Sequence, residues 1–222
     1  MNKVVTIEDL KQSYDVKVCI QAADDSLSQL GYTEHGERHA NLVAHMAENV
    51  LRRLGHAARR AELAAMAGYL HDIGNMVNRI DHGQTGALIA WDILRGMRLE
   101  TQEIAPIVAA IGNHEADSGD PVNDMAAALI LADKADVHRS RVRTQDTTAT
   151  DIHDRVNYAA QHSFLRVNEV KKTITLEVTI DTQISALMDY FEIFLSRMLA
   201  SRRAAKFLDC NFELMINKVK LL

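Results

Sequence analysis

The segment that most constrains the fold of this chain is an apolar run that ends in an adjacent histidine and aspartate. Six of the seven residues from 64 to 70 are Ala, Met, Leu or Tyr, and His71 and Asp72 follow directly. This composition predicts a helix that is packed on several sides. Its terminal imidazole and carboxylate need partners, because an unpaired buried charge costs several kcal/mol. A divalent metal ion would be such a partner, and the nearby Gly74 is typical of a helix end.

The size and composition of the chain indicate a metabolic protein of the cytoplasm. A length of 222 residues predicts one sizeable domain with a small appendage. Cys19 and Cys210 lie far apart without metal-ligand spacing, which favours a reducing compartment. No apolar stretch approaches the roughly 20 residues that span a bilayer, so we expect no membrane segment. The net charge of −5 argues against a broad nucleic-acid surface but leaves room for a local phosphate site.

The first three quarters of the chain are predicted to be helical. Only two prolines occur, and Ala, Leu and Met are abundant, which favours helix. Thr6 and Asp9 are suited to cap the first helix, and Gly31 ends it. The predicted helices cover residues 7–30, 36–54, 57–72, 84–95, 100–112 and 123–137, with a weaker helix over 150–162.

The pattern changes after residue 162. Apolar and polar residues alternate over 173–181, and together with 163–170 this segment predicts a hairpin across Lys171-Lys172. An amphipathic helix over 183–207 and a strand-like segment over 210–222 follow. The expected fold is therefore mostly α, with a helical domain over residues 1–162 and a β-β-α-β subdomain over 163–222. A strand left at the sheet edge could pair with a second copy, which would give a homodimer.

Further histidines and aspartates stand at the ends of predicted elements or inside apolar helices. Asp133 is the clearest, because residues 126–132 before it are uniformly apolar. Each residue alone is explained more simply as a helix cap or a satisfied core residue, but the set is not. Its other members are His35, His82 and His114.

Together with the His71-Asp72 pair, this set resembles the HD-domain superfamily, whose pattern is H…HD…D with additional histidines in two-metal members. The resemblance covers roughly residues 30–145. The matches are His35 for the first histidine, Arg38 for the basic residue that follows it, His71 and Asp72 for the central motif, Asp133 for the last aspartate, and His82 and His114 for the additional histidines.

Two departures from the family pattern narrow the subgroup. Asn75 stands where the usual residue is Lys. Asn113 replaces the second adjacent histidine of the cyclic-dinucleotide phosphodiesterases, and Asp-Ser-Gly-Asp-Pro over residues 117–121 stands near where that subgroup carries Gly-Tyr-Pro. We therefore do not expect that activity. The chain is more similar to compact dinuclear members, which include hydrolases of diadenosine polyphosphates.

The resemblance implies an HD-domain helical bundle that holds one or two divalent ions (Fe, Mn, Ni, Co, Zn or Mg). His35, His71, Asp72 and Asp133 would hold one ion. His82 and His114 would hold a second ion, with Asp72 as a bridge between the two. Two ions roughly 3.5–4 Å apart could bind an attacking water and the phosphoryl oxygens together, so we expect Asp72 to be catalytic.

Phosphoryl transfer also needs cations near the phosphate oxygens. Lys134 follows the last expected ligand, and we predict that it is both catalytic and substrate-binding. Arg38, Arg139 and Arg141 are the other candidates for substrate binding, although a solvated helix end would explain the last two equally well. His39 lies one helical turn after His35 and could line the site, but packing is the preferred interpretation.

The predicted function is hydrolysis of a nucleotide or another small phosphorylated metabolite by a metal-dependent phosphohydrolase. Two alternatives stay open. Some dinuclear HD proteins resemble this ligand set and use a mixed-valent di-iron centre to oxygenate a carbon substrate. A non-catalytic ligand-sensing module would also carry the motif.

Overall fold

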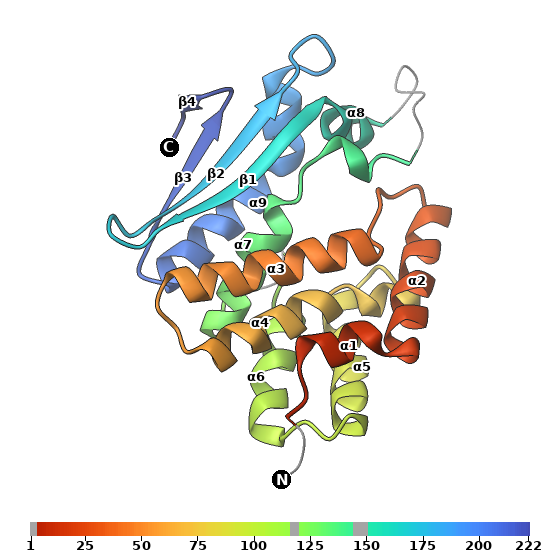
Figure 1. Ribbon diagram of the computed structural model, residues 1–222. Coiled ribbons are helices and arrows are strands. Elements are labelled where there is room, and N and C mark those ends of the chain that lie inside the picture. Colours follow the sequence, from red (N-terminus) through yellow and green to blue (C-terminus); the bar gives the residue numbers. More distant parts are fainter. Residues whose placement is uncertain (1–3, 116–119, 144–150) are drawn as a thin grey trace.

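The computed structural model describes residues 4–115, 120–143 and 151–222 and consists of a helical bundle that carries a small sheet at one end (Figure 1). The mostly α fold with a C-terminal sheet subdomain is confirmed. The helices are α1 (Ile7–Gln12), α2 (Tyr14–Gln29), α3 (Glu37–Arg53), α4 (Ala58–Leu70), α5 (His82–Gly96), α6 (Thr101–Gly112), α7 (Asp124–Ala135), α8 (Ile152–Ala159) and α9 (Leu187–Phe207), with short 3-10 helices η1 (Ile73–Met76) and η2 (Arg139–Arg141). The strands are β1 (Ala160–Asn168), β2 (Thr173–Ile180), β3 (Asn211–Ile216) and β4 (Val219–Lys220).

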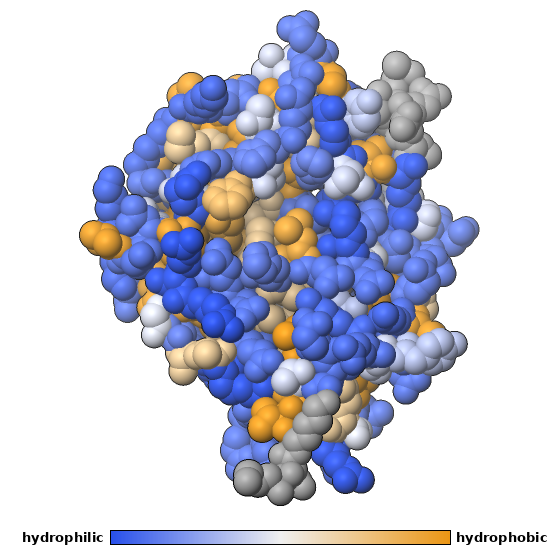
Figure 2. Space-filling model, in the orientation of Figure 1, coloured by the Kyte–Doolittle hydropathy of each residue, from blue (hydrophilic) through white to orange (hydrophobic). Residues whose placement is uncertain are grey.

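Helix α7 lies at the centre of the bundle. Every residue from Met125 to Ala135 is buried, as expected of a helix that is apolar on all sides. Helices α3, α4, α6 and α9 pack around α7. The face seen in Figure 2 is mostly hydrophilic, with apolar residues in patches between the polar ones. The polar groups of α7, Asp133 and Lys134, are therefore held inside an apolar frame.

Helices α3 and α4 approach each other closely at Gly68. A methyl group at this position would stand 2.9 Å from the backbone nitrogen and Cα of Ala44. Such a short distance between backbones requires glycine on one side. The close approach brings the N-terminal end of α3 and the C-terminal end of α4, which carry His39 and His71, next to each other.

The sheet has the order β1-β2-β3-β4. Strands β1 and β2 form the predicted antiparallel hairpin, and β3 joins β2 in parallel after the crossover through α9. Ile174, Leu176, Val178 and Ile180 are buried as one apolar face and join the helical residues in one continuous core. The division into domains 1–162 and 163–222 stays a prediction, as does pairing of two copies at an edge strand.

The structure corrects several element boundaries. The predicted helix over 7–30 is two helices, because Ser13 ends α1 and caps the start of α2. Helix α8 gives way to β1 at Ala160, so the end predicted at residue 162 falls inside a strand. The predicted strand over 210–222 is a short hairpin, since Asn217 and Lys218 adopt positive φ angles between β3 and β4. Residue 150 and residues 117–119 lie outside the described residues.

Within the described ranges, we find no helix with the length and apolar character that crossing a membrane requires.

The close approach at Gly68 generates a prediction. Gly68→Ala should lower the free energy of unfolding by about 1–3 kcal/mol, because the added methyl group meets backbone that cannot move aside cheaply. Urea unfolding measures the change. Gly96→Ala is the matched control, since nothing lies within 4 Å of a Cβ there, and it should leave the stability equal or raise it by up to about 1 kcal/mol. Equal stability of both variants would contradict the packing argument.

Candidate metal centre

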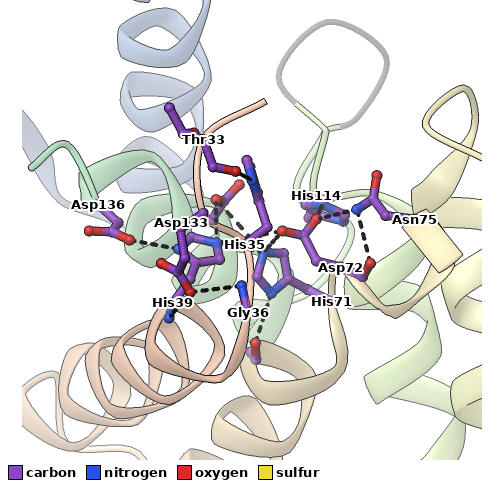
Figure 3. A network of polar contacts seen from close by, with 12 residues as sticks. Thr33, His35, Gly36, His39, His71, Asp72, Asn75, His114, Asp133 and Asp136 are labelled. Carbon is purple, nitrogen blue, oxygen red and sulfur yellow. Dashed lines mark hydrogen bonds and ion pairs between the residues drawn. The ribbon is translucent and has the colours of Figure 1, made fainter. Parts of the chain in front are cut away.

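The candidate centre lies where five segments of the helical bundle meet (Figure 3). His71 is the C-cap residue that follows α4, and Asp72 is the N-cap residue that precedes η1. The change from α-helix to 3-10 helix at this point lets two consecutive residues face the same site, which a continuous helix would not allow. The other segments contribute His39 from α3, His82 from the start of α5, His114 after the end of α6, and Asp133 from α7.

A first set of ligand atoms converges between α3, α4 and α7. The Nε2 atom of His71 lies 3.2 Å from Asp72 Oδ2 and 3.7 Å from Asp133 Oδ1. The Nε2 atom of His39 lies 3.6 Å and 3.5 Å from the same two oxygens. All four side chains are almost fully buried. Two imidazoles and two carboxylates at these distances can hold one divalent ion.

A second set shares Asp72 with the first. Asp72 Oδ1 lies 3.3 Å from His82 Nε2 and 3.9 Å from His114 Nε2. The two oxygens of Asp72 thus face different groups of histidines. The donor atoms form three groups, and within each group all atoms lie within 4.8 Å of one another. The groups share the residues His71, Asp72 and His114. This arrangement is compatible with metal binding, and Asp72 is the carboxylate that the two sets share.

Each histidine of the cluster holds its Nδ1 atom against an oxygen acceptor, and four of them direct Nε2 toward the carboxylates of Asp72 or Asp133. A buried imidazole that is oriented in this way presents a lone pair at Nε2, as metal-ligating histidines do. The Nδ1 contacts are His35 to Thr33 O (2.6 Å), His39 to Asp136 Oδ2 (2.7 Å), His71 to Gly68 O (2.8 Å), His82 to Arg79 O (3.1 Å) and His114 to Ile111 O (2.6 Å).

The charges in the cluster stabilise one another. Burial alone would lower the pKa of His71, but the carboxylates of Asp72 and Asp133 raise it to about 10. Burial opposes ionisation of Asp72 as well, and His71 and His82 nevertheless hold the pKa of Asp72 well below its usual range. Burial and nearby positive charge lower the pKa of His35 and of His114. The last two imidazoles are therefore neutral at pH 7.

Part of the cluster, namely Asp72, His82, His114 and Asp133, lines a cavity of about 220 Å³. Glu115 lines one side of this cavity. Its Oε1 atom accepts a hydrogen bond from Gly83 N at 3.0 Å and lies 3.3 Å from His82 Nδ1. Three cationic side chains line the cavity from different elements: Arg79, Lys134 and Arg197. Lys134 also pairs with Asp133 Oδ2. The cavity can therefore receive an anion above the carboxylates.

The structure gives other positions to the arginines predicted to bind substrate. Among the described residues, those that line this cavity do not include Arg38, Arg139 or Arg141. Arg38 pairs with Asp136 Oδ2 at 2.8 Å. Arg141 is 1% exposed and donates to the backbone carbonyls of Glu34 and Asp136. Arg139 lies over the ring of Tyr158. The buried Asp136 carboxylate explains the positions of Arg38 and Arg141, because a buried carboxylate needs positive partners.

The predicted ligand His35 lies beside the cluster rather than among the converging sets. Its ring centre is 5.4 Å from that of His39, and it lines the cavity. In the first ligand set, the position predicted for His35 is occupied by His39. Packing was the preferred interpretation for His39 in the sequence. His35 precedes the start of α3 at Glu37, whereas His39 opens the buried stripe that continues with Val43 and Ala47. A histidine in phase with a buried stripe is the signal that could have identified it.

Two family positions that depart from the usual pattern also find a physical role. Asn75 donates a hydrogen bond to Asp72 Oδ1 at 3.1 Å and so orients the bridging carboxylate. Asn113 donates to Ala109 O at the end of α6 and lies outside the cavity lining.

Gly74, expected as a helix stop, lies inside η1, where a Cβ would overlap the carbonyl oxygen of His82. Glycine is needed there for the approach of α5.

Comparisons with known proteins agree with this site. The family model described as "HD domain" matches residues 36–192, which is well over half of the chain. The chain belongs to the HD domain family, and this membership suggests a metal-dependent hydrolase. The uncharacterized protein MJ1020 of Methanocaldococcus jannaschii is 28% identical in an alignment of 140 residues that covers 53% of this chain and 53% of that protein. The chain thus spans about half the length of this relative.

The assignment of His39 generates a prediction. His39→Ala should weaken Mn²⁺ binding on the order of 100-fold or more, because the first ligand set loses one imidazole and Asp136 loses one of its partners. Calorimetric titration of the metal measures the affinity. His45→Ala changes an exposed histidine of the same helix and should bind Mn²⁺ as the wild type does. Equal affinity in the His39 variant would remove this residue from the centre.

The raised pKa of His71 generates a prediction for pH dependence. A group with a pKa of about 10 is protonated at pH 7, and a metal ligand must be neutral, so binding releases this proton. The affinity for Mn²⁺ should therefore rise by about tenfold per pH unit from pH 6.5 to 9. Titrations in two buffers of different ionisation enthalpy report the proton release. An affinity that stays constant over this range would contradict the prediction.

Proposed function

We propose that the chain is a metal-dependent phosphohydrolase that uses two divalent ions. The observation that carries the proposal is the shared orientation of the buried histidines, whose Nδ1 atoms are held by oxygen acceptors. In four of them Nε2 faces the carboxylates of Asp72 or Asp133. The first ion would be held by His39, His71, Asp72 and Asp133. The second would be held by His82, His114 and the shared Asp72.

The bound ions would supply an activated water and neutralise charge on the phosphoryl oxygens. The chain's own residues position the reactants around them. Lys134, Arg79 and Arg197 line one cavity from three elements, so they are suited to bind the oxygens of a phosphate. Asn75 and Glu115 keep Asp72 and His82 in place through the contacts described above.

The cationic lining favours hydrolysis over oxygenation. The two chemistries share the same kind of ligand set, so the histidines and aspartates do not distinguish them. Three cations around a cavity of about 220 Å³ favour a substrate with concentrated negative charge, such as a phosphate ester. We propose a nucleotide or another small phosphorylated metabolite as the substrate. The free cysteines support a cytoplasmic setting.

The function is tested by metal analysis of the purified protein together with a panel of phosphate esters. Under anaerobic conditions with Mn²⁺, the wild type should release phosphate from at least one ester. Asp72→Ala should abolish metal binding and lower kcat/KM about 1,000-fold or more, because both ligand sets share this carboxylate. Asp92→Ala, which changes an exposed aspartate of α5, is the matched control and should keep full activity.

Two results would overturn the proposal in different ways. Oxygen consumption with ferrous iron and no phosphate release would assign the centre to an oxygenase. Metal binding without turnover of any ester would favour a ligand-sensing module.

A further inference from the structure

A second cavity, of about 380 Å³, adjoins the first. The two cavities share His35, Arg79 and Arg197, so these side chains stand at the junction between them. The second cavity extends from the junction toward Tyr32 and α8. Its size falls in the range of small-molecule sites, which is about 300–1,000 Å³. We infer that it binds the leaving group of the substrate, an uncharged organic group that carries hydroxyl or amino hydrogen-bond donors.

This inference rests on the proposed function in one respect, namely that the phosphoryl group occupies the first cavity. A phosphate ester consists of a compact anion and an organic group joined through one oxygen. The first cavity contains Lys134 and the candidate metal ligands, whereas the part of the second cavity beyond the shared arginines is lined mainly by neutral and acidic groups. These two linings match the two parts of the ester.

The chemical class assigned to the leaving group rests on Asn157. Its side chain lines the second cavity and is 95% buried, with 5% of its surface exposed. The Nδ2 atom donates to the backbone carbonyl of His153 at 2.8 Å, which fixes the orientation of the amide. The Oδ1 atom is buried and has no hydrogen-bond partner among the described residues. A buried acceptor without a hydrogen bond destabilises the protein, and a donor from a ligand would remove this cost.

The other groups of the cavity also select against a charged occupant. Asp151 and Asp154 line it and offer further acceptors, which disfavours an anion and favours hydroxyl or amino groups. The cations at the junction disfavour a positively charged group close to the phosphate. Tyr32 adds an aromatic wall that is 43% exposed and carries Arg79 over its ring at 5.4 Å. An uncharged donor-bearing group is the occupant that meets all of these conditions.

Arg197 links the two cavities. Its guanidinium lies 4.7 Å from the ring centre of Phe194, and within the described part of the chain it has neither an ion-pair nor a hydrogen-bond partner. A half-buried cation without a carboxylate partner is available to an anionic ligand. At the junction it is suited to contact the oxygen that joins the phosphoryl group to the leaving group.

The same donor chemistry could come from the ribose and base of a nucleotide or from a sugar. Three esters separate these sources: adenosine 5′-monophosphate, glucose 6-phosphate and p-nitrophenyl phosphate, whose leaving group carries no donor. The wild type with Mn²⁺ should prefer one of the two hydroxylated esters over p-nitrophenyl phosphate by at least about tenfold in kcat/KM.

Asn157→Leu should lower kcat/KM for the preferred ester about tenfold or more, while kcat/KM for p-nitrophenyl phosphate stays within about twofold. Asn41→Leu is the matched control, because Asn41 makes the same side-chain hydrogen bond to the carbonyl four residues earlier, in α3 and outside the cavity. If Asn157→Leu does not fold, Asp154→Ala should produce the same loss of preference.

Binding of the leaving group alone separates this inference from the proposed function. Ligand-observed NMR with metal-free protein should detect adenosine or glucose, and the signal should fall in Asn157→Leu but not in Asn41→Leu. Hydrolysis of all three esters without preference would overturn the inference and leave the phosphohydrolase intact. A lack of phosphate release together with Asn157-dependent binding would overturn the phosphohydrolase and keep the ligand site. Absence of such binding overturns the inference.

Discussion

The burial of two carboxylates, Asp72 and Asp133, is the constraint on which the rest of the molecule depends. A buried carboxylate is stable only beside positive or hydrogen-bonding partners. Here the partners are imidazoles that arrive from four elements around the central helix α7. Each imidazole is fixed by a second contact to a backbone carbonyl or to Asp136. The bundle is therefore organised around a polar centre that lies within an apolar frame and opens to one cavity.

Much of this centre could be predicted from the sequence, and the exception has a physical cause. Asp133 and the His71-Asp72 pair stand out because they interrupt apolar helices. His39 was assigned to packing because His35 had already been matched to the first histidine of the family pattern. The start of the helix was predicted within one residue of its observed start at Glu37, but a pattern of residue types does not give the direction in which each of two histidines four residues apart points. The mostly α fold depends instead on composition and long periodicity, which do not require side-chain directions.

Residues that meet across long sequence separations were not predicted. Arg197 belongs to a helix whose apolar stripe predicts core packing, and nothing in its local pattern points to a site. It reaches the cavity because α9 packs on α7 after the crossover between β2 and β3. Likewise, Arg141 looked available for substrate, but the buried carbonyl groups of Glu34 and Asp136 require its guanidinium. Competition between buried partners for a cation is a three-dimensional property.

Gly74 shows that the geometry of the candidate metal centre depends on the packing of the surrounding backbone. Any side chain there would collide with the backbone of His82, so the segment after the His71-Asp72 pair and the first turn of α5 form a single tight crossing. The bridging carboxylate and the histidine of the second ligand set are consequently held at a spacing that the backbone itself defines. Transfer of these ligands to another helical bundle would have to carry this crossing with them. The ligating side chains alone would not reproduce the centre.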